Sequence, residues 1–101
     1  MTPAECRTKE DIRREIDRLD RELIDLLVAR FGYVQRMAEI KHDPAEARVE
    51  ARVTDVLNKV RALAGERGLD ADLAAQLWTR LMDWNIEWER RAIAARKRQP
   101  G

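Results

Sequence analysis

Apolar residues recur at three- and four-residue steps through residues 10–41, a stretch without proline. They are Ile12, Ile16, Leu19, Leu23, Leu26, Val34 and Met37. Such spacing is typical of one amphipathic helix. Two cations interrupt the series: Arg30 lies where an apolar residue is expected, and Lys41 takes the position after Met37. Because an unpartnered buried cation is costly, the helix is either exposed at these positions or faces something anionic.

The length of this helix bears on assembly. A helix over residues 10–41 spans about 48 Å at about 1.5 Å per residue. The radius of gyration of a compact domain of this size is only about 13 Å. Two shorter helices from the same chain cannot easily cover such a long apolar stripe. We therefore interpret the length as a sign of an obligate dimer.

A second helix is expected to follow a short link. Asp43, Pro44 and Glu46 suit its N-cap and first turn. Its apolar positions are Val49, Val53, Val56, Leu57, Val60 and Leu63. Gly65 and Gly68 are expected to act as C-cap glycines at its end.

The third helix is expected to begin at Asp70, an N-cap residue. The stripe interpreted as its core face is Leu73, Leu77, Leu81, Trp84 and Trp88. A neighbouring stripe carries Trp78, Met82, Asn85 and Glu89. Residues 1–9 are expected to form a lead-in with Thr8 as N-cap, and residues 90–101 a basic tail that frays. The pattern predicts a single all-α domain over residues 1–101, a three-helix chain with a long first helix.

Composition narrows the function classes. The chain has 39% charged residues but a net charge of only +1, so no strong field attracts nucleic acid or a membrane surface. No apolar run approaches the roughly 18 residues of a membrane span. Cys6 is the only cysteine, which excludes an intrachain disulfide and favours a reducing cytoplasm. The charged N-terminus has no signal-peptide pattern.

Many catalytic routes lack the necessary residues. The chain has one histidine and one cysteine, so a nucleophilic triad would depend on His42 or Cys6. No metal-binding motif and no glycine-rich phosphate loop occurs, and we expect no metal and no cofactor. A catalytic site in this chain would have to work through shape and charge.

The cations at unusual positions suit that kind of site. Arg30 and Lys41 are about three helical turns apart on one face, roughly 16 Å along the axis, and can clasp a small dianion. Arg52 can close the same space. Arg13 lies about 25 Å from Arg30, so it can reach such a ligand only from an antiparallel partner chain. Taken singly, each arginine is better explained as a solvated or salt-bridged surface residue, but the convergence of all four cations on plausible faces weakens that explanation.

The first helix resembles that of the all-helical chorismate mutases. The resemblance rests on IRREIDRLDRELIDLLVAR at residues 12–30, followed by Lys41. The opening PAEC-x4-DIR at residues 3–13 is most similar to the branch that contains isochorismate pyruvate lyase. The similarity extends over about residues 3–90.

This resemblance implies an intertwined homodimer of three-helix chains with two identical sites shared between the chains. The implied site residues are Arg13 from the partner, Arg30, Lys41, Arg52, Asn85 and Glu89. It also implies a cofactor-free pericyclic rearrangement of a small dicarboxylate, chorismate, to prephenate. Lys41 and a protonated Glu89 would donate to the ether oxygen, Arg13 and Arg30 would hold carboxylates, and Arg52 would flank the ring.

The sequence departs from the family pattern at three positions. Val53 replaces a glutamate that contacts the substrate hydroxyl, Val49 aligns near a usual aspartate, and Glu89 stands where many members carry glutamine. Chorismate mutase is our first interpretation. Isochorismate pyruvate lyase, which forms salicylate, is the second and is favoured by Val53. A mutase acting on an amino analogue and a non-catalytic helical dimerisation module remain open.

Overall fold

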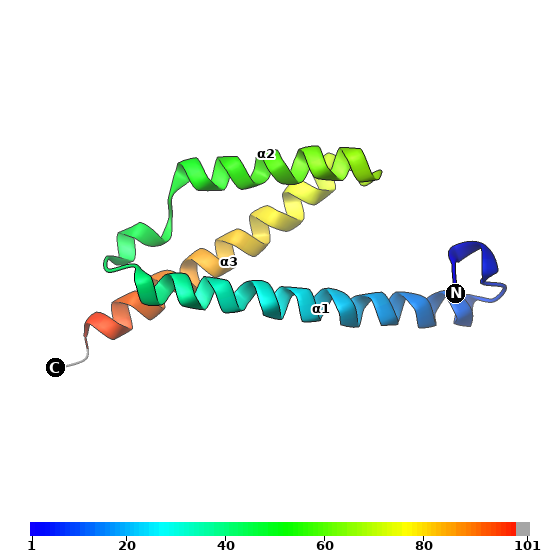
Figure 1. The fold of residues 1–101 in the computed structure, drawn as a ribbon, viewed down its shortest axis with the longest axis horizontal. Coiled ribbons are helices and arrows are strands. Elements are labelled where there is room, and N and C mark those ends of the chain that lie inside the picture. Colours follow the sequence, from blue (N-terminus) through cyan, green and yellow to red (C-terminus); the bar gives the residue numbers. More distant parts are fainter. Residues whose placement is uncertain (99–101) are drawn as a thin grey trace. The chain divides into compact units, whose positions relative to one another are not determined.

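The computed structural model describes residues 1–98, and within this range it contains helices and no strands. In chain order the elements are η1 (Pro3–Glu5), α1 (Lys9–Ile40), η2 (Pro44–Ala47), α2 (Glu50–Arg67) and α3 (Ala71–Lys97) (Figure 1). The all-α prediction of three helices with a long first one is confirmed. The chain forms two compact units, Met1–Tyr33 and Val34–Gly101, which we describe separately.

The start of α1 is fixed by a reciprocal cap. The Asp11 N–H donates to Thr8 Oγ1 at 3.0 Å, and Asp11 Oδ2 accepts the N–H groups of Arg7 and Thr8 at 3.0 and 3.3 Å. Donation from Arg7 and then Thr8 lowers the pKa of Asp11 below its ordinary value. The predicted N-cap at Thr8 is confirmed, because both halves of the motif lie within four residues and need no tertiary support.

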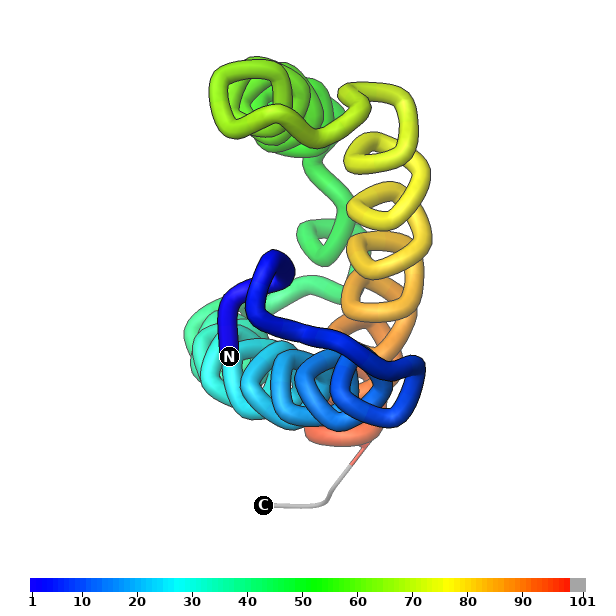
Figure 2. Tube along the Cα trace, turned by 90° about the vertical axis from the view of Figure 1, so that its right-hand side faces the viewer, coloured from blue at the N-terminus to red at the C-terminus, as the bar shows by residue number. Residues whose placement is uncertain are grey.

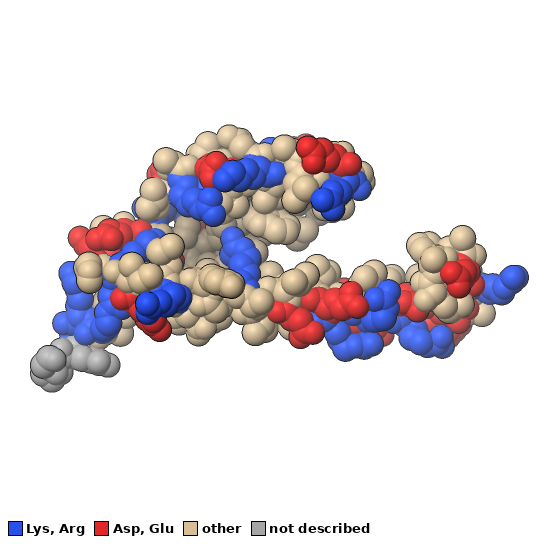
Figure 3. Space-filling model, in the orientation of Figure 1, with Lys and Arg blue, Asp and Glu red and all other residues tan. Residues whose placement is uncertain are grey.

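The first unit leaves the apolar face of α1 uncovered. Its side chains on that face are between 48% and 67% exposed. They are Ile12, Ile16, Leu19, Leu23 and Leu26. Acidic and basic side chains are interspersed along α1 on the face that Figure 3 shows. A repeated apolar stripe without a partner in its own unit is unusual for a soluble helix.

In the second unit, α2 and α3 pack together as a helical hairpin, seen with α2 nearly end-on in Figure 2. Gly68 ends α2 with a φ of 86°, a conformation that favours glycine. The Leu69 N–H then donates to the Ala64 carbonyl at 2.8 Å. Asp70 accepts the Leu73 N–H at 2.9 Å, which confirms it as the N-cap of α3.

Two predicted helix boundaries are wrong. The Asp43–Pro44 motif begins the short turn η2 rather than α2, and α2 starts only at Glu50. Ala47, buried at the end of η2, packs toward α3, and the backbone then runs extended before α2 begins. Gly65 is a helical residue inside α2, so Gly68 alone acts as the C-cap glycine.

The buried face of α3 differs from the predicted core stripe. Its buried residues are Ala74, Ala75, Met82, Asn85, Glu89 and Ile93. By contrast, Leu73, Leu77 and Trp84 are 44%, 54% and 56% exposed. Leu81 and Trp88 of the same stripe are half-buried, so the predicted core stripe is buried only in part, and small alanines take the most buried positions near the start of α3.

The predicted fraying of residues 90–101 is wrong for residues 90–97. These residues continue α3 to Lys97, and Ile93 is fully buried. Residues 99–101 lie outside the described range. Within residues 1–98, none of the helices combines the length and apolar character needed to traverse a bilayer.

Candidate active site

Lys41 and Glu89 form the one close pair among the sequence-predicted site residues in the described part of the chain. Lys41 Nζ lies 2.7 Å from Glu89 Oε1, and the two side chains are 19% and 7% exposed. Lys41 follows the last residue of α1, whereas Glu89 comes from the middle of α3. The end of α1 and the middle of α3 thus meet at an ion pair that is largely shielded from water.

Asn85 lies on the same stripe of α3, one helical turn before Glu89. Both are buried, at 7% and 6% residue exposure, and Met82 continues the stripe at 7%. A buried polar group needs a hydrogen-bond partner to offset its lost solvation. Glu89 Oε1 is buried without a well-directed hydrogen bond from residues 1–98, although Lys41 Nζ lies at ion-pair distance. The site therefore holds acceptor capacity that the chain itself does not fully use.

The predicted cation Arg52 is placed differently from Lys41. It lies in the first turn of α2, and its Nη1 donates to Asp55 Oδ2 at 2.8 Å. Its side chain is 66% exposed. The structure therefore engages Arg52 with its own helix rather than with the Lys41–Glu89 pair.

Arg13 and Arg30 belong to the unit Met1–Tyr33. Arg13 is exposed and Arg30 half-buried. Among residues 1–98 neither guanidinium pairs with a carboxylate, whereas the neighbouring Arg14 and Arg18 bind Asp11 and Glu15. Arg21 is unpaired in the same range, so lack of a partner does not by itself identify a binding arginine. It does leave Arg13 and Arg30 available to an anionic ligand.

One residue near the pair had no sequence signal. Arg96 of α3 donates from Nη1 to the Ala38 carbonyl at 2.6 Å and from Nη2 to the Lys41 carbonyl. Its partners are main-chain oxygens far away in sequence, so no local motif predicts the contact. Its position in a run of basic residues instead favoured a solvated tail.

The outer face of α3 shows the ordinary use of arginine. Arg90 and Arg91 both donate to Glu87, at 2.6 and 2.9 Å. These two guanidinium groups, with Arg90 the larger influence, lower the pKa of Glu87 to about 2. Glu87 is thus a surface carboxylate that remains ionised.

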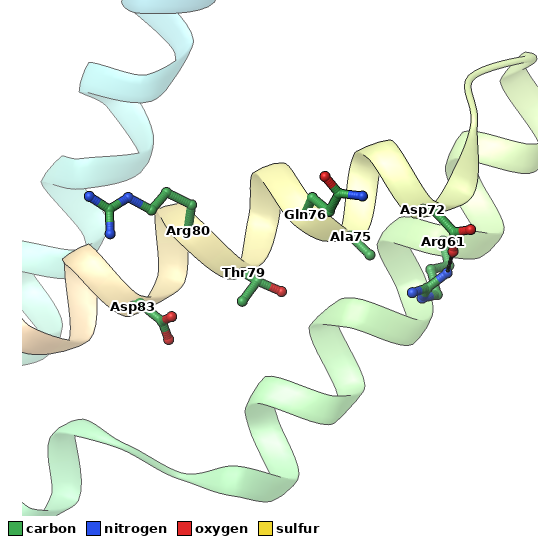
Figure 4. A pocket seen from close by; sticks show the side chains of 7 residues that line it. All are labelled: Arg61, Asp72, Ala75, Gln76, Thr79, Arg80 and Asp83. Atoms are coloured by element: carbon green, nitrogen blue, oxygen red, sulfur yellow. Dashed lines mark hydrogen bonds and ion pairs between the residues drawn. The ribbon is translucent and has the colours of Figure 1, made fainter.

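A second polar surface lies between α2 and α3. This groove is lined by Arg61, Asp72, Ala75, Gln76, Thr79, Arg80 and Asp83 (Figure 4). Arg61 binds Asp72 at 2.7 Å, and Asp83 accepts from Arg48 at 3.2 Å. None of the predicted site residues lines it. The groove therefore occupies a different stripe of α3 from Asn85 and Glu89.

Within residues 1–98, no three His, Cys, Asp or Glu side chains gather closely enough to hold an ion. The candidate site offers the half-buried ammonium of Lys41, the buried carboxyl group of Glu89 and the buried amide of Asn85. Such a set can bind and polarise an oxygen-rich anion.

Comparison with known proteins assigns the family. Residues 12–90 match the protein family described as "Chorismate mutase type II". The chain belongs to this family. The match begins near the start of α1 and ends just after Glu89, so it includes every predicted site residue. The expected resemblance to the all-helical chorismate mutases is confirmed.

A curated relative is similar over most of both chains. The isochorismate pyruvate lyase of Pseudomonas aeruginosa is 33% identical over 85 residues, which cover 84% of each protein. This confirms the similarity to the lyase-containing branch that the opening residues indicated. Together, family and relative support an enzyme that acts on chorismate-like substrates.

Proposed function

We propose that this protein is a chorismate mutase, which converts chorismate to prephenate by a pericyclic rearrangement. In this reaction the ether carbon–oxygen bond breaks as a carbon–carbon bond forms within one molecule. No group leaves and no nucleophile is required. The observation that carries the proposal is the shielded Lys41–Glu89 pair at 2.7 Å, inside the segment that matches the family.

Lys41 is the proposed donor to the ether oxygen. An ammonium has three protons to donate, so the contact with Glu89 leaves capacity for a substrate oxygen. Negative charge grows on that oxygen in the transition state. A preorganised donor in a site with little water stabilises such charge far more than water does. A protonated Glu89 is the proposed second donor.

The remaining cations are proposed to bind and fold the substrate. Arg30, and Arg13 from a partner chain, would each hold a carboxylate, for which arginine offers two parallel hydrogen bonds. Arg52 would leave Asp55 to flank the ring, and Asn85 would contribute its amide. Holding the enolpyruvyl group over the ring supplies the orientation on which an intramolecular reaction depends.

The partner contribution requires a homodimer. The apolar face of α1, with Leu23 and Leu26 at 57% and 67% exposure, supports this assembly. Covering such a face with a second copy of α1 removes apolar surface from water at roughly 25 cal/mol per Å². In the proposed dimer, the contact that buries the apolar face of α1 also places Arg13 in the partner chain's site, so the same contact serves both stability and function.

Isochorismate pyruvate lyase is the second candidate. Two observations favour it: the relative of that name and Val53 in place of a glutamate that would contact the mutase substrate's hydroxyl. In this reaction the same cations would assist elimination of pyruvate to leave salicylate. The proposed binding residues are identical, so the two candidates differ in substrate and product.

Incubating the purified protein separately with chorismate and isochorismate distinguishes the candidates. Prephenate from chorismate with little salicylate from isochorismate supports the mutase proposal. If salicylate and pyruvate form from isochorismate with a much higher kcat/KM than prephenate forms from chorismate, the mutase proposal is wrong and the lyase takes its place. Turnover of neither substrate, by a correctly folded helical protein, would overturn both and leave a binding role.

A further inference from the structure

We propose that Arg96 is a positioning residue that holds Lys41 in place for the proposed reaction. This inference rests on the proposed function of Lys41. Arg96 is not one of the residues proposed to contact the substrate. It acts on the backbone that carries Lys41, through its hydrogen bonds to the carbonyls of Ala38 and Lys41.

The C-terminal end of α1 needs an external cation. The last carbonyls of a helix lack intrahelical partners and carry partial negative charge. Basic side chains near such an end usually satisfy them, but the last turn of α1 contains none. Arg96 fills this role from α3, because its planar fork carries several donors and can bind two carbonyls at once.

The same helix holds Lys41 at two points. Glu89 contacts its ammonium at 2.7 Å, and Arg96 binds its carbonyl two helical turns later on α3, roughly 10 Å along the axis. Between these two residues, Ile93 is fully buried and fixes this part of α3 in the unit. Lys41 is therefore anchored at both its main chain and its side-chain tip by one rigid element.

This arrangement has a kinetic consequence. A catalytic donor must lie within a fraction of an ångström of its productive position, and a displacement of about 1 Å can cost roughly 100-fold in rate. Without Arg96 the carbonyls of Ala38 and Lys41 lose the guanidinium that binds them, and the Lys41 main chain is held less firmly. We expect Arg96→Ala to lower kcat at least tenfold and to change KM much less.

The activity test compares four proteins: wild type, Arg96→Ala, Arg96→Lys and Arg91→Ala. Arg96→Lys keeps the charge but cannot fork onto two carbonyls, so it should recover only part of kcat. Arg91→Ala removes an arginine from the same helix that binds Glu87 on the outer face and should retain wild-type kcat. A loss in Arg96→Ala equal to that in Arg91→Ala, or confined to KM, would overturn the proposal.

A second measurement does not depend on turnover. Thermal unfolding is compared for wild type, Arg96→Ala, Lys41→Met and the double variant. If Arg96 positions the Lys41 side chain against Glu89, Lys41→Met should lower Tm less in the Arg96→Ala background than in wild type. Additive Tm shifts would overturn the inference. If wild type turns over neither substrate, the proposed function fails and this cycle alone decides whether Arg96 positions Lys41.

Discussion

Glu89 Oε1 and Lys41 Nζ lie 2.7 Å apart, with side chains only 7% and 19% exposed. The other ion pairs whose carboxylates lie on α3, such as Glu87 with Arg90, are far more exposed. An exposed pair adds little to stability, whereas a shielded pair is costly to desolvate and is weak support for a purely structural role. Among these ion pairs, the Lys41–Glu89 pair is therefore the candidate for a catalytic role.

Lys41→Ala is expected to lower kcat by at least about 100-fold, the scale for removing one preorganised donor. The physical reason is that the proposed contact with the ether oxygen strengthens as negative charge develops there. Steady-state kinetics on the accepted substrate checks it. Lys9→Ala is the matched control, because that lysine is exposed at the first residue of α1. A Lys41 effect on KM alone would show that Lys41 only binds substrate.

Glu89→Gln is expected to retain activity and to abolish any decline in kcat/KM that accompanies a rise in pH. An ionised carboxylate has no proton to donate, while a glutamine amide donates at any pH. If Glu89 donates to the ether oxygen, wild-type activity therefore falls as Glu89 loses its proton. The measurement is the pH–rate profile of both proteins.

The ionisation of two other side chains must be distinguished from that of Glu89 in this pH–rate profile. His42 is exposed directly after Lys41, so both proteins should also be measured in a His42→Gln background. Glu87 has a pKa of about 2 and stays ionised throughout the assay range, so it cannot cause such a decline. Identical profiles for wild type and Glu89→Gln would remove Glu89 as the donor.

Local motifs allowed part of the fold to be predicted from sequence. Thr8 with Asp11 and the cap at Asp70 were correct because each needs only neighbours within a few residues. The start of α2 was predicted wrongly at Asp43–Pro44, because the capping residues there favour a helix start as strongly as those at Asp70. Burial of Ala47 against α3 is a tertiary effect, and it separated η2 from α2.

The residue pattern alone predicted the candidate site only where a residue type was unusual. Lys41 stood at an apolar position of the first-helix pattern and was singled out by it, whereas Asn85 and Glu89 were indicated as site residues by the family resemblance. The stripe containing Trp84 was misjudged as core because periodicity gives the faces of a helix but not which face packs inward. Arg96 was not predicted as a site residue because its acceptors are backbone carbonyls. Every residue has such a group, so the amino-acid types do not indicate the contact.

The glycines of α2 give a paired stability test with opposite signs. Gly68→Ala places an L side chain at a φ of 86° and should destabilise by about 1–2 kcal/mol. Gly65→Ala lies within the helix, where an added Cβ meets no atom within 4 Å, and should stabilise by about 0.5–1 kcal/mol. Urea unfolding of the three proteins checks both signs. A destabilised Gly65→Ala would instead support its predicted role as a second C-cap.

Subunit exchange tests whether the proposed sites are shared between chains. If Arg13 acts in the partner's site, a heterodimer of Arg13→Ala and Arg30→Ala contains one site with both arginines intact and one with neither. After random exchange in an equal mixture of the two inactive proteins, about half of the dimers are heterodimers. Each heterodimer has one intact site of two, so about a quarter of the wild-type activity should return.

The matched control for exchange pairs Arg30→Ala with Lys41→Ala. Both of these residues would serve the site of their own chain, so every site in that mixture lacks one of them and no activity should return. Exchange itself is verified by native mass spectrometry of differently tagged chains. Recovery in the first mixture but not in the second requires Arg13 to act across the dimer. Proven heterodimers without recovery in either mixture would contradict the shared site and confine Arg13 to the surface of α1.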